Sequence, residues 1–224
     1  MEGTRMPEES IHRRMFEDRA QKTVFGQAQT FALDYMAAVA GRSVFPDQDA
    51  LDGLRVFDES LPMNPTPSTD VISLLHEFGS PSTVAQTGGR YFGFVNGNVV
   101  PAALAASWLA GAWDQNAALG VMSPIAAKLE SVCEDWLVEL LGLPEGTAAG
   151  LVSGTSVATL CGLAAGRYSV LKKLGWDVNA SGLRKAPEVR FVASEQSHAT
   201  VFKALALLGI GRNEVEIVPF DTQG

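Results

Sequence analysis

The feature that most constrains this chain is an alternation of apolar runs and helical patterns between residues 150 and 219. Short apolar runs at 150–152, 189–193 and 214–219 predict strands, and the segments between them predict helices. Strand–helix–strand order is typical of parallel βαβ units. We therefore expect the second half to begin a doubly wound α/β sheet, which is incomplete in this chain because only about three strands are visible.

The first half has the pattern of helices rather than strands. Apolar residues recur at roughly helical spacing from residue 9 to residue 40, which predicts one or two helices. Ser68 or Thr69 is expected to cap a short helix that ends near Phe78. A buried helix is predicted over 101–113, because that segment is almost entirely apolar.

Ser123 and Pro124 predict the start of a further helix, since serine is a good N-cap and proline suits the first helical turn. Its apolar stripe consists of Leu129, Val132, Trp136, Leu137, Leu140 and Leu141. These patterns divide the chain into a helical N-terminal segment, 1–87, and the first part of a large α/β domain, 88–224.

Composition excludes several classes of protein. Hydrophobic residues make up 46% and charged residues 19%, which is ordinary for a globular protein. The net charge of -8, without a basic patch, argues against nucleic-acid binding. The N-terminus has no signal-peptide pattern and the longest apolar stretch is interrupted, so we expect a cytoplasmic protein without a membrane span.

Cys133 and Cys161 fit no metal motif, and we expect two reduced thiols in the core and no metal site.

A turn of small residues, Ser153-Gly154-Thr155-Ser156, follows the first predicted strand. Backbone N–H groups at a helix start lack intrahelical acceptors, and the helix dipole favours an anion there. Gly154 permits a close approach, and the hydroxyl groups add donors. The turn therefore suits a phosphate, although Ser and Thr also act as plain helix caps. It matches neither the Walker A motif nor the dinucleotide-binding fingerprint.

Two further segments carry side chains suited to a ligand site. His198 follows the second predicted strand, so it is expected at the same edge of the sheet as the turn. An imidazole can stack on a flat heteroaromatic ring, and it titrates near neutrality. The loop that holds Phe92, Phe94 and Asn96 can form the wall of a pocket. A structural histidine and a loop held to the core by its aromatic rings are the alternatives.

The order and spacing of these segments resemble the group II pyridoxal-phosphate (PLP) dependent amino-acid decarboxylases, the family of the aromatic-amino-acid and glutamate decarboxylases. The resemblance runs from about Gly88 to Gly224. The motifs that carry it are Gly89-Arg90-Tyr91-Phe92-Gly93-Phe94, Ser123-Pro124, Leu129-Glu130, Trp136-Leu137, Ser153 to Leu160, Ala164-Ala165-Gly166-Arg167 and Ser194 to Ala199.

The resemblance implies a PLP-dependent transferase-like fold, that of aspartate aminotransferase, and a homodimer whose active site lies at the subunit interface. It implies decarboxylation of an L-amino acid to an amine and CO2, with pyridoxal 5'-phosphate as cofactor. The helical N-terminal segment would be the arm that wraps the partner subunit.

The resemblance also implies roles for individual residues. Gly154, Thr155 and Ser156 would hold the phosphate of PLP. His198 would stack on the pyridine ring and assist proton transfer. The substrate pocket would be lined by Phe92, Phe94 and Asn96. Ser123 would contact the cofactor of the partner subunit.

The chain departs from the family pattern in two respects. Val157 stands where the family often has an acidic residue. The family's Schiff-base lysine follows a histidine, and its pyridinium-nitrogen aspartate lies on a preceding strand. No lysine of this chain follows a histidine, so both residues are expected after residue 224. We therefore expect this chain alone to be inactive and the complete enzyme to carry out the reaction.

Two other functions stay open at this point. The first is another PLP reaction on the same fold, by a carbon–carbon lyase or an aminotransferase. The second is a noncatalytic interaction module. Phe92, Phe94 and Trp113 would suit an aromatic substrate, whereas an acidic one would need a cation such as Arg90. Apolar surface at Trp108 and Trp113 favours a large interface, and hence the homodimer.

Overall fold

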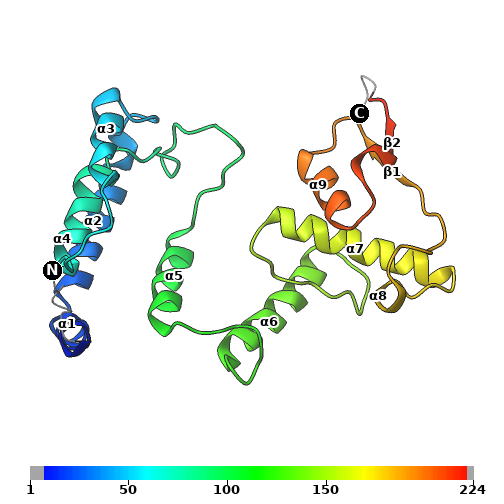
Figure 1. The fold of residues 1–224 in the computed structure, drawn as a ribbon, viewed down its shortest axis with the longest axis horizontal. Helices are drawn as coiled ribbons and strands as arrows, with labels where there is room; N and C mark the ends of the chain where they lie inside the picture. The colour runs from blue at the N-terminus through cyan, green and yellow to red at the C-terminus, as the bar shows by residue number, and fades with distance from the viewer. Residues whose placement is uncertain (1–7, 221–224) are drawn as a thin grey trace, which may run out of the picture. The chain divides into compact units, whose positions relative to one another are not determined.

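The computed structural model describes residues 8–220 of the chain. The chain divides into two compact units, one that extends to Trp113 and one that starts at Asp114. Figure 1 labels the helices and strands of both units. The domain boundary predicted at residue 88 stays a prediction, because compactness alone does not define a family's domains.

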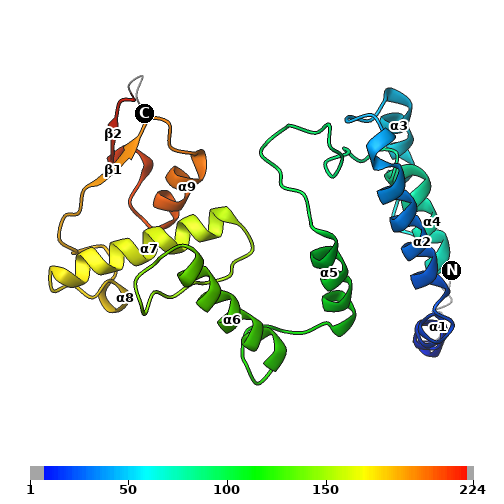
Figure 2. The ribbon, with the colours of Figure 1, turned by 180° about the vertical axis from the view of Figure 1, so that it is seen from behind.

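The first unit is helical. Helix α1 (Glu8–Gln21) and helix α2 (Thr23–Ala38) are separated by Lys22, whose left-handed backbone (φ 58°) interrupts the helix. Helix α4 (Ser68–Leu74) continues into a π-helical turn, η3 (Leu75–Gly79), and lies beside α2 (Figure 2). The prediction of one or two helices over residues 9–40 is confirmed, with two formed, and so is the short helix that ends near residue 78.

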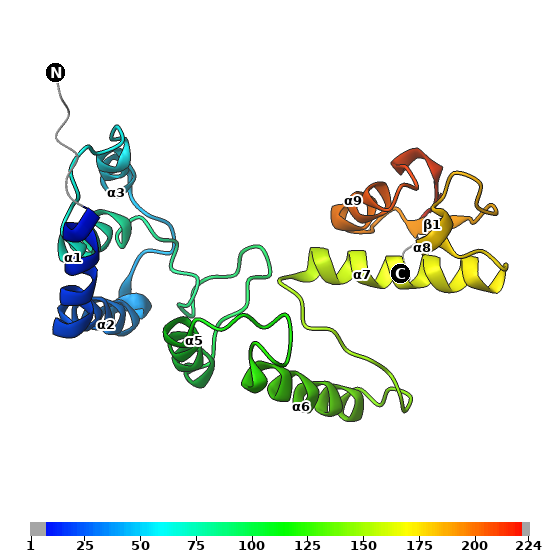
Figure 3. The ribbon, with the colours of Figure 1, turned by 60° about the horizontal axis from the view of Figure 1, so that its bottom comes forward.

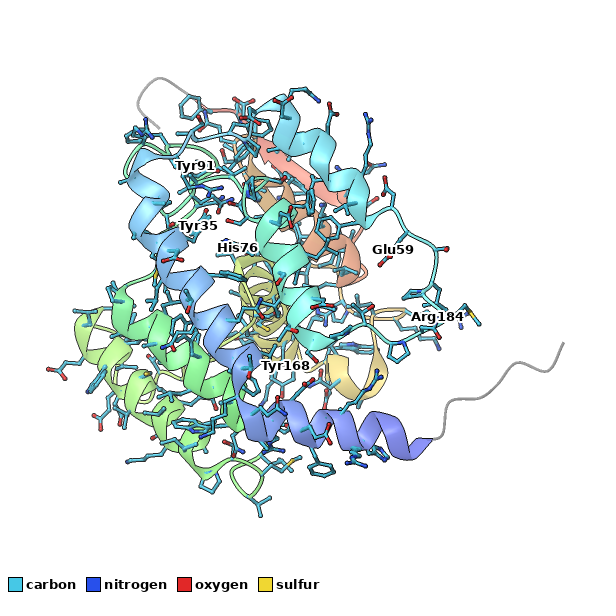
Figure 4. The ribbon with its side chains drawn as sticks, turned by 90° about the vertical axis from the view of Figure 1, so that its left-hand side faces the viewer. Tyr35, Glu59, His76, Tyr91, Tyr168 and Arg184 are labelled. Atoms are coloured by element: carbon cyan, nitrogen blue, oxygen red, sulfur yellow. The ribbon has the colours of Figure 1, made fainter. Side chains whose placement is uncertain are left out.

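Helices α2 and α4 are joined by polar and aromatic contacts. Gln27 Nε2 donates to Ser73 Oγ at 2.7 Å. The rings of Phe31 and His76 stack with a centroid separation of 3.7 Å and an interplanar angle of 7°. Figure 4 shows His76, which lies on η3, beside α2, the helix of Phe31 and Tyr35. These contacts hold the helical unit together although few of its side chains are fully buried.

The connection from α2 to α4 contains η1 (Val39–Gly41), α3 (Gln48–Gly53) and η2 (Leu54–Phe57). Capping differs from the prediction at the start of α4. Pro67 occupies the N-cap position, and the Ser68 hydroxyl donates to the Asp18 carboxylate instead of capping the helix. The expectation that Ser68 or Thr69 would be the cap was wrong, because the helix begins one residue earlier: Ser68 is already its first helical residue, and the flanking Pro67 has no side-chain acceptor.

Helix α5 (Pro101–Trp113) begins and ends where the sequence predicted. The predicted burial is wrong. Trp108 is 42% exposed and Trp113 is 53% exposed. An apolar composition all round a helix predicts that its surface will be covered, but it does not identify the segment of polypeptide that covers it.

The second unit begins with α6 (Pro124–Leu140), which confirms the predicted start. The Ser123 hydroxyl accepts from the Ala126 N–H at 3.4 Å, and Gly142 follows the helix with φ 61°. The apolar stripe of α6 is largely exposed, with Trp136 at 66% and Leu140 at 81%. The helix is therefore formed by its local signals and leaves an apolar face open to solvent.

Helix α7 (Thr155–Lys173) packs against the short helix α8 (Val178–Ser181) and against helix α9 (Ala199–Leu207). Strand β1 (Phe191–Ser194) pairs in parallel with β2 (Val215–Val218), with Phe191 opposite Val215. The turn η4 (Arg212–Glu214) precedes β2. Figure 3 shows α9 beside α7. The buried apolar residues of this unit are Leu171, Val178, Ala204, Leu205 and Val215.

The parallel pairing of β1 and β2 across α9 confirms the α/β class. The strand predicted over residues 150–152 is not formed, and that segment is extended without a ladder partner in the described part of the chain. An apolar run needs a neighbouring strand before it becomes part of a sheet. Cys133 and Cys161 are free, but Cys161 is exposed, so its predicted place in the core is wrong.

Within residues 8–220, no helix combines the length and the apolar composition needed to cross a lipid bilayer. The same residues contain no group of three or more His, Cys, Asp or Glu side chains placed to bind a metal ion.

Candidate cofactor site

The turn at residues 153–156 forms an open helix N-terminus. Gly154 is the N-cap of α7 and has an extended backbone (φ 168°, ψ 169°). The N–H groups of Val157 and Ala158 both donate to the Gly154 carbonyl at 3.0 Å. Thr155 and Ser156 precede these first helical bonds, so their N–H groups are available to an anion. All of 153–156 is exposed.

The space in front of Gly154 is open. A Cβ built on this residue would meet no heavy atom within 4 Å. The glycine is therefore not required by packing inside this unit, and its φ value is one that any residue adopts. The absence of a side chain here is compatible with the predicted approach of a phosphate to the helix N-terminus.

His198 lies after β1 and is the N-cap of α9. Its Nδ1 accepts from the Thr200 N–H at 3.3 Å and lies 2.9 Å from Thr200 Oγ1. Acceptance at Nδ1 requires a lone pair there, so the neutral ring carries its proton on Nε2. The ring is exposed, which leaves its face and its Nε2–H available to a ligand.

The four residues predicted to bind the cofactor lie in the same compact unit. Gly154, Thr155 and Ser156 open α7, and His198 opens α9, which packs against α7. Arg167 Nη1, on α7, donates to the Leu208 carbonyl at the end of α9 at 2.6 Å. The phosphate turn and the histidine are thus carried by two helices that are joined to each other.

Ser123 lies in this unit too, and its side chain is fully buried. Its hydroxyl oxygen caps α6 through the Ala126 N–H. The structure therefore assigns it a capping contact, and the contact with a partner subunit's cofactor stays a prediction.

The loop of Phe92, Phe94 and Asn96 lies in the first unit, and the phosphate turn lies in the second. Both aromatic rings are more than 90% exposed. Asn96 Nδ2 donates to the Tyr91 hydroxyl at 3.2 Å. Phe94 and its neighbour Val95 both have left-handed backbones, with φ of 54° and 55°. Their role in a substrate pocket stays a prediction.

Arg90, the cation considered for an acidic substrate, is engaged in another way. Its guanidinium donates to the carbonyl of Ala40 at 3.1 Å and to the carbonyl of Arg42. It therefore fastens the loop to the end of the α2–η1 helical segment. A guanidinium that satisfies two backbone carbonyls has fewer donors left for a substrate carboxylate.

Two residues with a bearing on the site were not singled out individually from the sequence. Glu134 Oε1, on α6, accepts from the Ala149 N–H at 2.9 Å, on the segment that leads to the phosphate turn. Arg167 belongs to the motif Ala164-Ala165-Gly166-Arg167, to which the resemblance assigns no role. An arginine at the end of a motif of small residues could have pointed to Arg167. Nothing in the spacing of Glu134 predicted its bond to Ala149.

Comparison with known proteins identifies the family of this chain. The model of the pyridoxal-dependent decarboxylase conserved domain matches residues 52–224. The chain belongs to the pyridoxal-dependent decarboxylase family. Residues 153–156 and 198 all lie within the matched region, and the family's cofactor is pyridoxal phosphate.

Individual relatives agree with this assignment. Aromatic-L-amino-acid decarboxylase from Bos taurus is 29% identical over 202 residues, which are 85% of this chain and 40% of the relative. The crystal structure of mouse CSAD superposes with a TM-score of 0.78 at 19% identity, over 92% of this chain and 43% of that one. The structure of Oryza sativa TDC with PLP and tryptamine gives 0.77 at 24% identity, over 92% and 42%.

These two solved structures, one of them with PLP bound, confirm the predicted fold. The chain spans about two fifths of the length of the relatives that it matches.

Proposed function

We propose that the complete protein decarboxylates an L-amino acid to an amine and CO2 with pyridoxal 5'-phosphate as its cofactor. The observation that carries the proposal is the open N-terminus of α7 at Gly154, within the region that matches the decarboxylase domain. When bound, the cofactor supplies the electron sink for loss of the carboxylate.

The phosphate would be held by the first turn of α7. The N–H groups of Thr155 and Ser156 point out of the helix start, where the helix dipole adds positive potential. Gly154 leaves the approach free of a side chain. Val157 provides no carboxylate beside these donors, so the phosphate would not face an additional negative charge at this position.

His198 would contribute a ring face and a proton. Its Nδ1 is engaged with Thr200, which fixes the ring orientation and leaves the Nε2–H directed away from the cap contact. A ring fixed in this way can stack on a flat heteroaromatic group and hold a proton for transfer at Nε2.

We propose an aromatic or other uncharged amino acid as the substrate. The Bos taurus relative is an aromatic-L-amino-acid decarboxylase. Arg90 is engaged by two backbone carbonyls, which leaves it poorly suited to an acidic side chain. Phe92 and Phe94 would line the pocket, and the exposed apolar faces of α5 and α6 would be covered in a homodimer of the complete protein.

The test uses the purified product of the complete reading frame with PLP added. We expect a visible absorption band that borohydride converts to a stable adduct, mapped by mass spectrometry to a lysine outside residues 1–224. Incubation with L-tryptophan, L-tyrosine and L-glutamate should release CO2 from the aromatic substrates. A protein that takes up no PLP would contradict the proposal and favour the noncatalytic interaction module. Amino-group transfer without CO2 release would favour an aminotransferase.

A further inference from the structure

A side chain of α6 holds the segment that leads to the phosphate turn. Glu134 Oε1 accepts from the Ala149 N–H at 2.9 Å, and the contact is partly buried. A hydrogen bond from a neutral donor to a carboxylate is stronger than one between neutral groups. This bond therefore joins a regular helix to a piece of extended chain.

The extended chain has little else to fix it. For residues 148–153 the bond to Glu134 is the one hydrogen bond that the described part of the structure provides. Leu151 is 58% exposed, so its side chain adds little packing. The segment continues directly into Gly154, and the position of the turn therefore depends on how Ala149 is held.

Helix α6 is a suitable support for such an anchor. It runs from Pro124 to Leu140 with Ser123 as a buried N-cap. Glu134 lies within this helix, away from either frayed end. A carboxylate on a rigid element can fix the backbone atom that it binds more closely than a side chain on a loop can.

We propose that Glu134 is a positioning residue for the cofactor phosphate. It acts through Ala149 on the turn of Gly154, Thr155 and Ser156 and does not touch the cofactor. The inference rests on the proposed function, since it assumes that this turn binds the phosphate.

The experiment compares two ligands in the cofactor-free full-length protein: PLP and pyridoxal, which lacks the phosphate. The dissociation constant of pyridoxal divided by that of PLP measures the contribution of the phosphate site. In Glu134→Ala we expect this ratio to fall by about tenfold, equivalent to the loss of one charge-assisted hydrogen bond. Glu134→Gln keeps an acceptor oxygen, and we expect a ratio within about threefold of the wild-type value.

Glu139→Ala is the matched control. Glu139 lies on the same helix and is exposed, and its side chain makes no hydrogen bond to residues 148–153 in the described structure. We expect it to leave the ratio unchanged. Hydrogen exchange gives a second readout without cofactor: the Ala149 amide should exchange about tenfold faster in Glu134→Ala than in the control.

The outcomes separate the two proposals. Equal weakening of PLP and pyridoxal in Glu134→Ala, or an unchanged ratio, would overturn the positioning role while wild-type binding keeps the proposed function. A wild-type protein that binds both ligands equally would contradict the phosphate site itself. In that case, an Ala149 amide that exchanges equally fast in Glu134→Ala and in the control would also contradict the bond from Ala149 to Glu134. Faster exchange in Glu134→Ala would support this bond but not a role in phosphate binding. If Glu134→Ala does not fold, a Glu134→Gln ratio that falls by the full tenfold would count against the acceptor role.

Discussion

At the scale of single residues, the candidate site consists of backbone donors and one side chain that serves two purposes. His198 caps α9 through Nδ1 and presents its ring to solvent. The sequence placed this histidine at a strand end, but it could not reveal the cap. A capping contact depends on the backbone angles of the following turn, which are fixed only when α9 packs.

Replacement of His198 can separate these two purposes. Asparagine is a good N-cap, so His198→Asn should leave the melting temperature of the complete protein nearly unchanged. The turnover rate should fall by about tenfold or more, because the ring contact and the Nε2 proton are lost. His198→Ala, which lacks a cap, should in addition lower stability by roughly 1 kcal/mol. Equal activity of His198→Asn and wild type would contradict the catalytic role.

Gly154 offers a second prediction. Since a Cβ there meets nothing within 4 Å, Gly154→Ala should not reduce the thermal stability of the cofactor-free protein. It should raise the dissociation constant for PLP by about tenfold, because the methyl group would occupy the phosphate's approach. Calorimetry and a PLP titration check the two halves. A matched exchange at Gly150, which also meets nothing within 4 Å, should leave PLP binding unchanged.

At the scale of elements, local signals predicted the helices well. Ser123 and Pro124 start α6 as expected, and the α5 bounds agree with the apolar run. Burial was predicted less well, since α5 and the stripe of α6 are exposed. Strand formation at 150–152 failed for a related reason. A helix satisfies its backbone hydrogen bonds within itself, whereas a strand needs a neighbour that local sequence does not identify.

The contact between α7 and α9 is the element-level feature that links the two parts of the site. Arg167 donates to the Leu208 carbonyl, a group that the helix end leaves without an intrahelical partner. We expect Arg167→Met to lower the free energy of unfolding by roughly 1–3 kcal/mol, as measured by urea denaturation. Lys173→Met, an exposed cation at the end of the same helix, should cost less than about 1 kcal/mol. Equal effects of the two changes would show that the bond to α9 contributes nothing.

At the scale of the whole molecule, the chain carries more exposed apolar side chains than a stable monomer usually shows. Trp108, Trp113 and Trp136 are each more than 40% exposed. If the complete protein covers these faces, acrylamide should quench the tryptophan fluorescence of residues 1–224 alone much more strongly than that of the full-length protein. Sedimentation of the full-length protein as a monomer with equally quenched tryptophans would contradict the covered interface.

The pairing of β1 and β2 has a consequence for synthesis on the ribosome. The two strands are joined through α9 in one continuous stretch, residues 191–218, so their contact does not wait for a distant segment. Nearby contacts form quickly, and domains begin to fold from the N-terminal side while translation proceeds. The two strands that flank His198 and α9 can therefore pair as soon as residue 218 has left the ribosome.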